Sequence, residues 1–274
     1  MTAKPLRVPI QDDPILLRET VGPIAVITFN RPARRNTLSE EVIAALHGAL
    51  DEIATDAKIR ALVITSQGPV FSSGHDLKQL TAHRGDADGG RAYFARTMNA
   101  CSAMMQAIVN LPKPVIAAVQ GIATAAGCQL VASCDMAVAS DDARFATSGI
   151  DNGLFCSTPM VALSRNVSRK HAMEMLMTGE PISAQRAVDI GLINHVVPAG
   201  HERDAAIALA QKVARKSAYA IGLGKQAFYR QTEMNLADAY RFTAEVMTEN
   251  MMAFDAKEGI GAFLEKREPK WQDE

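Results

Sequence analysis

The sequence has no long hydrophobic run, few aromatic residues and almost no net charge. No apolar stretch approaches the about 20 residues of a membrane-spanning helix, so we expect no membrane partner. The formal net charge is −1 and no long basic tract occurs, which argues against binding to nucleic acid. The first 17 residues contain three prolines and lack the apolar centre of a secretory signal, so we expect a cytoplasmic protein.

Cysteine is also scarce, and its spacing excludes the common metal and redox motifs. The four cysteines are Cys101, Cys128, Cys134 and Cys156, and none lies in a C-x-x-C pair. All four have apolar or small neighbours, so we expect reduced, buried thiols and no metal site. Cys128 and Cys156 could act as nucleophiles, but no histidine is adjacent to either in the sequence, which favours inert thiols.

Hydrophobic patterning divides the 274 residues into three parts. Residues 1–13 are expected to form a flexible N-terminal arm. Strand-length apolar runs alternate with amphipathic helical patterns over residues 14–198, and helical patterns dominate residues 199–274. The fold class is therefore α/β, with an α-helical C-terminal region.

The most informative stretch runs from Lys113 to Asp135. An apolar run over 115–119 is followed by Gly121, then by Ala125, Ala126 and Gly127. This pattern predicts a strand, a sharp turn and a helix whose first N–H groups are accessible. Such a helix N-terminus suits a phosphate or an oxyanion that develops during a reaction. The alternative is that the small residues only allow close packing of helix on strand.

A second stretch, residues 70–78, repeats this arrangement. A strand end leads into Ser72, Ser73 and Gly74, and a short helix is expected from Asp76. Backbone N–H groups again follow a tight turn. The G-x-S-x-G pattern of serine hydrolases is missing here, which argues against that class of enzyme.

Taken together, segments spread over nearly the whole chain resemble the crotonase superfamily, the enoyl-CoA hydratase/isomerase group. Their order and spacing make the resemblance specific. The matching segments are 30–32, 36–38, 71–77, 113–121, 127–130, 134–135, 178–180, 191–193 and 258–263. The resemblance implies a crotonase-like spiral of ββα units over 14–198, which carries an acyl-CoA site. It also implies that residues 199–274 form a trimerisation region, in a homotrimer or a dimer of trimers.

The resemblance further implies that the ligand is an acyl-CoA thioester, with no cofactor apart from the coenzyme A that is part of the substrate. The backbone N–H groups of His75 and Ala126 would form an oxyanion hole for the thioester oxygen. The His75 side chain has no role in this interpretation. The residues expected to line the substrate site are Ser73, Gly74, Asp76, Leu77 and Gly127. Arg34 and Arg35 would meet the phosphates of coenzyme A and Lys78 its pantetheine, and the alternative for all three is an exposed, solvated side chain.

The chain departs from the family at the two catalytic glutamates, which fall on Gln129 and Gly149. An amide is neither an acid nor a base at neutral pH, and glycine has no side chain. Asp151 is the nearest carboxylate that could substitute, although an Asp in such a stretch more commonly caps a turn.

Three functions therefore remain open from the sequence. The first is a family enzyme, nominally an enoyl-CoA hydratase, that uses a non-standard base. The second is an acyl-CoA-binding protein with little or no turnover. The third is a CoA thioester hydrolase or decarboxylase, for which stabilisation of an oxyanion suffices.

Overall fold

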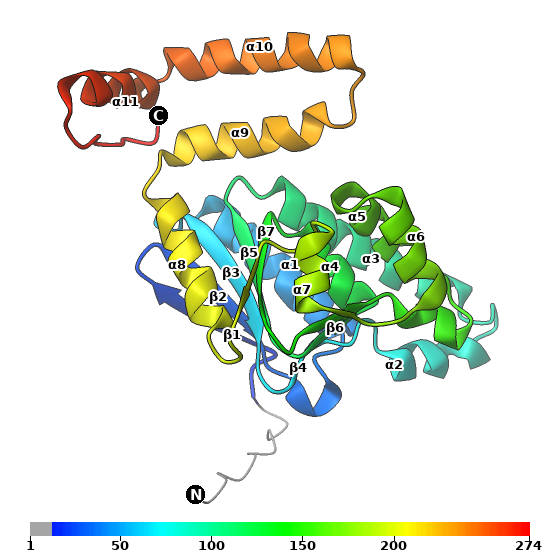
Figure 1. The fold of residues 1–274 in the computed structure, drawn as a ribbon. Helices are drawn as coiled ribbons and strands as arrows, with labels where there is room; N and C mark the ends of the chain where they lie inside the picture. Colours follow the sequence, from blue (N-terminus) through cyan, green and yellow to red (C-terminus); the bar gives the residue numbers. More distant parts are fainter. Residues whose placement is uncertain (1–12) are drawn as a thin grey trace, which may run out of the picture.

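The computed structural model describes residues 13–274, so the arm predicted over residues 1–13 lies outside the described residues except for Asp13. Figure 1 shows a core of strands and helices from which a set of C-terminal helices extends. Among the described residues, no helix is long and apolar enough to cross a membrane.

The larger of two sheets forms the centre of the core. Its six strands lie in the order β1-β2-β3-β5-β7-β10. Their bounds are β1 Leu16–Val21, β2 Ile24–Phe29, β3 Ala61–Ser66, β5 Val115–Val119, β7 Met136–Ser140 and β10 His195–Val197. Only β1 runs antiparallel to its neighbour; the other pairs are parallel. Every residue of β2, β3 and β5 is buried, because helices cover both faces, and this explains their continuous apolar runs.

A smaller sheet lies where the strands of the larger one end. Its strands are β4 Val70–Ser72, β6 Ile122–Thr124, β8 Arg144–Ala146 and β9 Ile182–Ser183. Each of β4, β6 and β8 follows directly on a strand of the larger sheet, so the chain advances by repeated ββα units. The sequence pattern did not predict β6 or β9, two short strands whose partners lie far away in the chain.

Helices cover the larger sheet unevenly. One face carries the main hydrophobic cluster, with α1, α3 and α4 packed together. The other face is covered by α8 through Ala206, Ile207 and Ala210. The helix bounds are α1 Glu40–Thr55, α2 Leu77–Ala82, α3 Arg91–Asn110, α4 Ala126–Ser133, α5 Pro159–Asn166, α6 Arg169–Thr178, α7 Ala184–Asp189 and α8 Glu202–Ala214.

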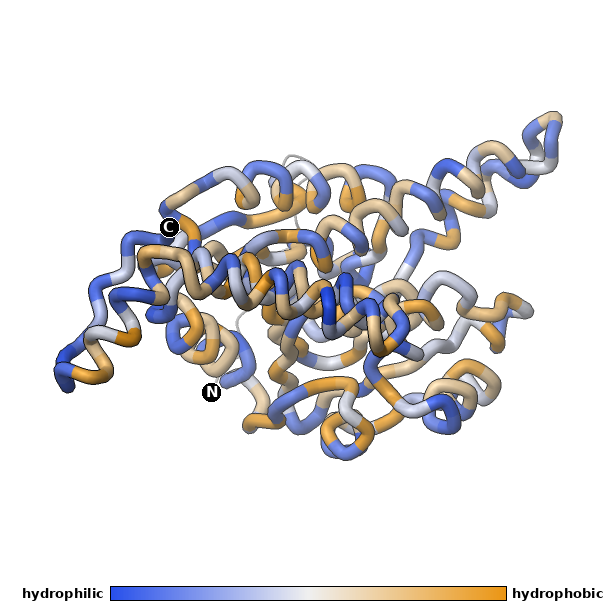
Figure 2. The backbone as a smooth tube through the Cα atoms, turned by 90° about the horizontal axis from the view of Figure 1, so that it is seen from above, coloured by the Kyte–Doolittle hydropathy of each residue, from blue (hydrophilic) through white to orange (hydrophobic). Residues whose placement is uncertain are grey.

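Three further helices form an arm that stands away from the core (Figure 1). They are α9 Ala218–Gln231, α10 Leu236–Met252 and α11 Phe254–Glu265. The sequence-based division after residue 198 groups α8 with this arm, whereas the structure packs α8 on the sheet. Figure 2, seen from above, shows hydrophobic segments between hydrophilic ones along the arm helices. Several large apolar side chains of the arm are exposed, among them Phe228, Leu236, Tyr240, Met252, Phe263 and Leu264.

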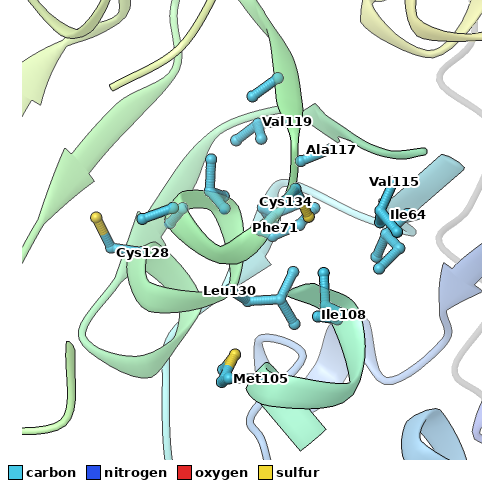
Figure 3. Close-up of a cluster of buried hydrophobic side chains, with 14 of the residues drawn as sticks. Ile64, Phe71, Met105, Ile108, Val115, Ala117, Val119, Cys128, Leu130 and Cys134 are labelled. Carbon is cyan, nitrogen blue, oxygen red and sulfur yellow. The ribbon is translucent and has the colours of Figure 1, made fainter. Parts of the chain in front are cut away.

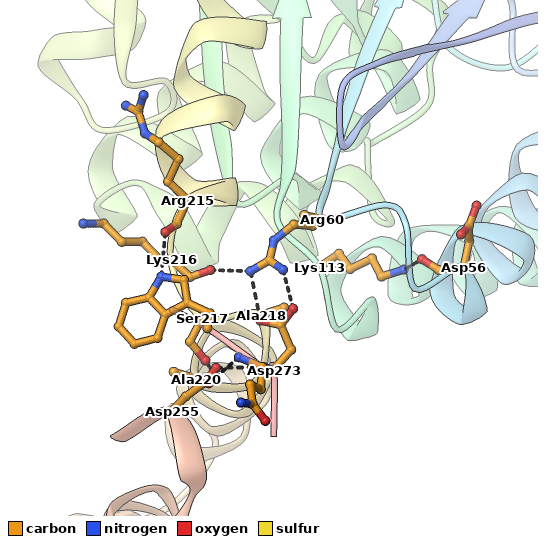
Figure 4. Close-up of polar contacts among 12 residues, drawn as sticks. Asp56, Arg60, Lys113, Arg215, Lys216, Ser217, Ala218, Ala220, Asp255 and Asp273 are labelled. Carbon is orange, nitrogen blue, oxygen red and sulfur yellow. Dashed lines mark hydrogen bonds and ion pairs between the residues drawn. The ribbon is translucent and has the colours of Figure 1, made fainter. Parts of the chain in front are cut away.

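The last residues fold back and fasten the start of the arm to the core (Figure 4). The indole Nε1 of Trp271 donates to the carbonyl of Arg215, 2.8 Å away, at the end of α8. The Asp273 carboxylate accepts from the N–H of Ala218 at 2.8 Å and pairs with Arg60 beside the sheet. The arm is therefore held at its base by polar contacts.

Candidate active site

The first turn of the candidate site joins β4 to α2. Gly74 adopts φ +81°, a conformation that favours glycine. Its carbonyl accepts from the N–H of Leu38 at 2.8 Å, and the N–H of Ser73 donates to the carbonyl of Arg35 at 3.1 Å. The N–H of His75 donates to no other described residue. The turn is thus fixed by its neighbours while one backbone donor stays available.

The second turn joins β6 to α4. Ala125 has φ 51° and ψ −120°, a rare conformation for a residue with a side chain. Its N–H donates to the carbonyl of Ala146, and its carbonyl accepts from the N–H of Gln129, each at 3.0 Å. A backbone held this way is strained by roughly 1–3 kcal/mol, and such strain clusters at functional sites. The N–H of Ala126, the first residue of α4, donates to no described residue.

The two turns meet at two glycines. A Cβ on Gly74 would lie 2.9 Å from the Cβ of Ala125 and 3.1 Å from the backbone nitrogen of Ala126. A Cβ on Gly127 would lie only 2.3 Å from the carbonyl oxygen of Ser72. Because no side chain separates the turns, the unengaged N–H groups that follow them lie close to each other.

The residues around the first turn have structural partners of their own. The Asp76 carboxylate accepts from the N–H groups of Lys78 and Gln79 at 2.9 and 3.3 Å, and so caps α2. Leu77 and Lys78 are exposed, and Ser73 is half-buried. The structure therefore gives Asp76 a capping role that the sequence did not reveal.

The loop that carries Arg34 and Arg35 is tied by Asn36 to the start of β4 and to the turn before it. Its amide nitrogen donates to the carbonyls of Gln67 and Val70 at 2.9 and 2.7 Å, and the residue is almost fully buried. Arg34 and Arg35 are exposed, and their guanidinium groups bond to no described residue. The sequence analysis used Asn36 only as part of a matching segment. The only signal in the sequence was an Asn in a loop that contains a proline.

The side of the site expected to face the acyl carbons contains no charged group from α4. All eight residues of α4 are buried. Figure 3 shows Leu130 beside Ile108 and the Cys128 sulfur on the opposite side of this helix. Gln129 is 5% exposed, and its Oε1 finds no partner among the described residues. A buried polar group without a partner is unusual and points to a ligand or water.

Position 149 has no room for a larger residue. Gly149 lies in the short 3-10 helix Ser148–Asn152. A Cβ there would lie 2.6 Å from the carbonyl oxygen of Leu154 and 2.7 Å from the Sγ of Cys156. The backbone of Leu154 and the thiol of Cys156 therefore fill the space that a side chain at position 149 would need.

The other titratable groups near the site are poorly suited to proton transfer. Burial lowers the pKa of His75 and outweighs the opposing effect of the Leu38 backbone, so its ring is neutral at pH 7. Burial raises the pKa of the Cys156 thiol, and that of Cys128 to about 12, so both stay protonated. No cluster of three or more metal-ligating side chains occurs within residues 13–274.

Asp151, the carboxylate that could replace a glutamate, lies on the surface. It is exposed, and its two carboxylate oxygens lie 3.2 and 3.3 Å from the place that a Cβ on Gly179 would occupy. Gly179 follows α6, so the carboxylate faces the end of that helix. This placement fits a turn residue better than a base.

Comparison with known proteins now decides the family. The family described as Enoyl-CoA hydratase/isomerase matches residues 19–274. The chain belongs to this family. "Enoyl-CoA hydratase domain-containing protein 3, mitochondrial" of Xenopus laevis is 47% identical over 262 residues, which cover 96% of this chain and 87% of that protein. The human protein of the same name is 48% identical over 248 residues, 90% of this chain and 80% of its own.

Solved structures of the enoyl-CoA hydratase/isomerase family match the fold. An enoyl-CoA hydratase from Mycobacterium smegmatis gives a TM-score of 0.90 at 48% identity, over 94% of this chain and 99% of its own. Human enoyl-CoA hydratase domain-containing protein 3 gives 0.89 at 47% identity, over 94% and 100%. The resemblance and the crotonase-like fold inferred from the sequence are confirmed.

The same comparison corrects the predicted location. Five relatives, from frog, human, rat, mouse and zebrafish, are named mitochondrial. The prediction of a cytoplasmic protein is therefore wrong. It rested on the composition of residues 1–17, which cannot separate the cytosol from another compartment inside the cell.

Proposed function

We propose that this family member binds an acyl-CoA thioester with its carbonyl oxygen between the N–H groups of His75 and Ala126. The contact of the two turns at Gly74 and Gly127, with both N–H groups left unengaged, carries the proposal. Two aligned donors stabilise the negative charge of an enolate or a tetrahedral intermediate, and one such donor is typically worth about 3 kcal/mol of barrier. Coenzyme A enters as part of the substrate.

Standard hydration of an enoyl thioester should be slow. Adding water across the double bond requires one group to activate water and another to protonate the α-carbon. Gln129 and Gly149 supply neither, His75 is neutral with a lowered pKa, and Asp151 faces Gly179. The protein thus has the means to stabilise an oxyanion but no evident acid–base pair.

A reaction that needs no acid–base pair is the second candidate. In a thioester that carries a carboxylate on the α-carbon, loss of carbon dioxide leaves the electron pair as an enolate, which the same N–H groups stabilise. Water then protonates the α-carbon. The buried, unpartnered amide oxygen of Gln129 favours this candidate, because a neutral amide provides polarity without a competing charge.

Binding and turnover are separated by one experiment. Calorimetric titration with crotonyl-CoA should show binding, while loss of the enoyl absorbance should be far slower than for a relative with both glutamates. Gly74→Ala, which places a methyl against Ala126, should abolish binding of the ester. Fast hydration by the wild type would refute the acid–base argument, and unchanged binding by Gly74→Ala would refute the oxyanion hole.

Arg34 and Arg35, both exposed, suit the phosphates of coenzyme A. The arm formed by α9, α10 and α11 suits a trimer interface. The arm exposes Leu236, Met252 and Phe263, each more than two-thirds accessible. Large exposed apolar patches mark interaction sites. Sedimentation should give three or six copies; a monomer at micromolar concentration would contradict this assignment.

A further inference from the structure

Asp135, just beyond the end of α4, is the centre of a polar cluster outside the candidate site. Its Oδ2 accepts from the N–H of Val115 and from the Nζ of Lys225, both at 2.7 Å. Its Oδ1 accepts from the hydroxyl of Tyr229 at 2.9 Å. Lys225 and Tyr229 belong to α9, so the arm reaches the core at the end of the helix that begins with Ala126.

Lys225 joins further elements at this point. Its Nζ also donates to the carbonyls of Ile108 and Lys113, each at 3.0 Å, so all three of its N–H groups are engaged. Its side chain is only 7% exposed. Burial lowers its pKa while Asp135 opposes the shift, and breaking such a buried pair is strongly destabilising. The ammonium therefore connects the end of α3, the start of β5, α4 and α9.

On one side of this cluster α9 is not closely packed. An open hollow of about 360 Å³ lies there, lined by Pro114, Met136 and Phe228 together with the cluster. Phe228 is 60% exposed. The bonds to Asp135 therefore add to the close approach of Gly222 to Pro112 in holding α9 against the core.

Helix α4 connects the cluster around Asp135 to the candidate site at Ala126. Helix α4 has only eight residues and rises about 12 Å from end to end, so it moves as one body. Its first turn touches β4 at Gly127, and its end is held through Asp135. A shift at the end is thus transmitted to the N–H of Ala126.

We propose that Lys225 and Tyr229 are positioning residues that orient the oxyanion-hole N–H of Ala126 by holding Asp135 at the far end of α4. The inference rests on the proposed function, because it assigns these residues to that same hole. It makes the docking of the arm a condition for polarising the thioester.

The test uses the full-length protein and carbonyl-labelled crotonyl-CoA. Infrared difference spectroscopy reports how far the hole lowers the stretching frequency of the bound carbonyl. Tyr229→Phe removes one hydroxyl and Lys225→Met removes the ammonium. The matched controls are Tyr240→Phe, on the exposed face of α10, and Lys212→Met, at an exposed position of α8. Hydrogen exchange at the N–H of Gln129 reports the first turn of α4 without any ligand.

Tyr229→Phe should lose part of the infrared shift of the bound carbonyl and should speed hydrogen exchange at the N–H of Gln129. Its affinity for free coenzyme A should equal that of the wild type. Both control variants should match the wild type in shift and exchange. Lys225→Met, if it folds, should lose more. Unchanged shift and exchange in Tyr229→Phe would overturn the inference. If the wild type does not lower the stretching frequency of the bound carbonyl, the proposed function is refuted. The exchange rates at the N–H of Gln129 in the wild type and in Tyr229→Phe would still decide whether the cluster holds α4.

Discussion

The two sides of the candidate site differ in what they are made of. The side proposed to hold the thioester oxygen consists of backbone, brought together by Gly74 and Gly127. The side expected to face the reacting carbons contains Gln129 and Gly149, the positions onto which the sequence pattern places the family's two glutamates. The oxygen side depends on positions that admit only glycine, whereas on the carbon side Gln129 can change its chemistry without a change of size. The fold therefore says more about the binding of an acyl group than about the reaction that follows.

Gly127→Ala should have the largest effect. The new methyl would meet the carbonyl oxygen of Ser72, so α4 must shift away from β4. Overpacking of this kind costs about 1–3 kcal/mol, and we expect loss of crotonyl-CoA binding as well. Denaturant unfolding and calorimetric titration measure the two effects.

Gly48→Ala is the matched control for that substitution. Gly48 lies in α1, and a Cβ there meets nothing within 4 Å. Alanine should raise stability by about 0.5–1 kcal/mol, because glycine is a poor helix former. Equal stabilities and equal affinities for crotonyl-CoA in Gly48→Ala and Gly127→Ala would show that the close approach of the two turns is unimportant.

Substitutions at Gly149 and Gln129, on the side expected to face the acyl carbons, should differ in their effects. Gly149→Ala should destabilise the protein by about 1–3 kcal/mol, since its methyl meets the carbonyl of Leu154 and the thiol of Cys156. Restoring both glutamates at once should thus fail for lack of space. Gln129→Glu alone should keep the fold and raise hydration of crotonyl-CoA as its buried carboxyl ionises at higher pH. A stable, active variant with both glutamates would disprove this difference.

The surface arginines should affect binding without affecting stability. Arg34→Ala with Arg35→Ala should weaken binding of crotonyl-CoA by about tenfold, the effect of roughly 1.4 kcal/mol. The thermal midpoint should stay unchanged, because neither guanidinium bonds to a described residue. Titration at two salt concentrations measures the loss, with Arg169→Ala, exposed on α6, as the control. Equal affinities for the double variant and the wild type would remove these arginines from the site.

The smallest effect concerns acid stability. His75 has a pKa below its ordinary value of about 6.5 because its ring is buried. The unfolded chain thus takes up a proton below about pH 6.5 that the folded chain does not, and stability falls as the pH drops through this window. His75→Asn should lose less stability than the wild type between about pH 7.5 and 5.5. Thermal midpoints measure this, with exposed His201→Asn as the control, and identical pH profiles for His75→Asn and the wild type would contradict the assignment.

The sequence was sufficient for the helices and the longer strands. Val115–Val119 is a continuous apolar run of strand length, and Glu40–Thr55 has an apolar face with a helical period. It was insufficient for β6 and β9, which depend on partners far away in the chain. The packing of α8 on the sheet was also hidden, because an alanine-rich helix face carries little hydrophobic signal.

Small residues at the two turns were the part of the candidate site that the sequence pattern could indicate. The glycines and alanines of the two turns pointed to exposed N–H groups before any coordinates were known. The cap formed by Asp76, the unpartnered amide of Gln129 and the crowding at Gly149 could not be foreseen. Each depends on a tertiary neighbour, such as Cys156, that lies elsewhere in the sequence.

The most direct test is a crystal structure with bound crotonyl-CoA. We expect the thioester oxygen about 2.9 Å from the backbone nitrogens of both His75 and Ala126, with the acyl carbons directed towards Gln129. A thioester oxygen that bonds to neither nitrogen, in a complex whose coenzyme A is fully ordered, would contradict the account.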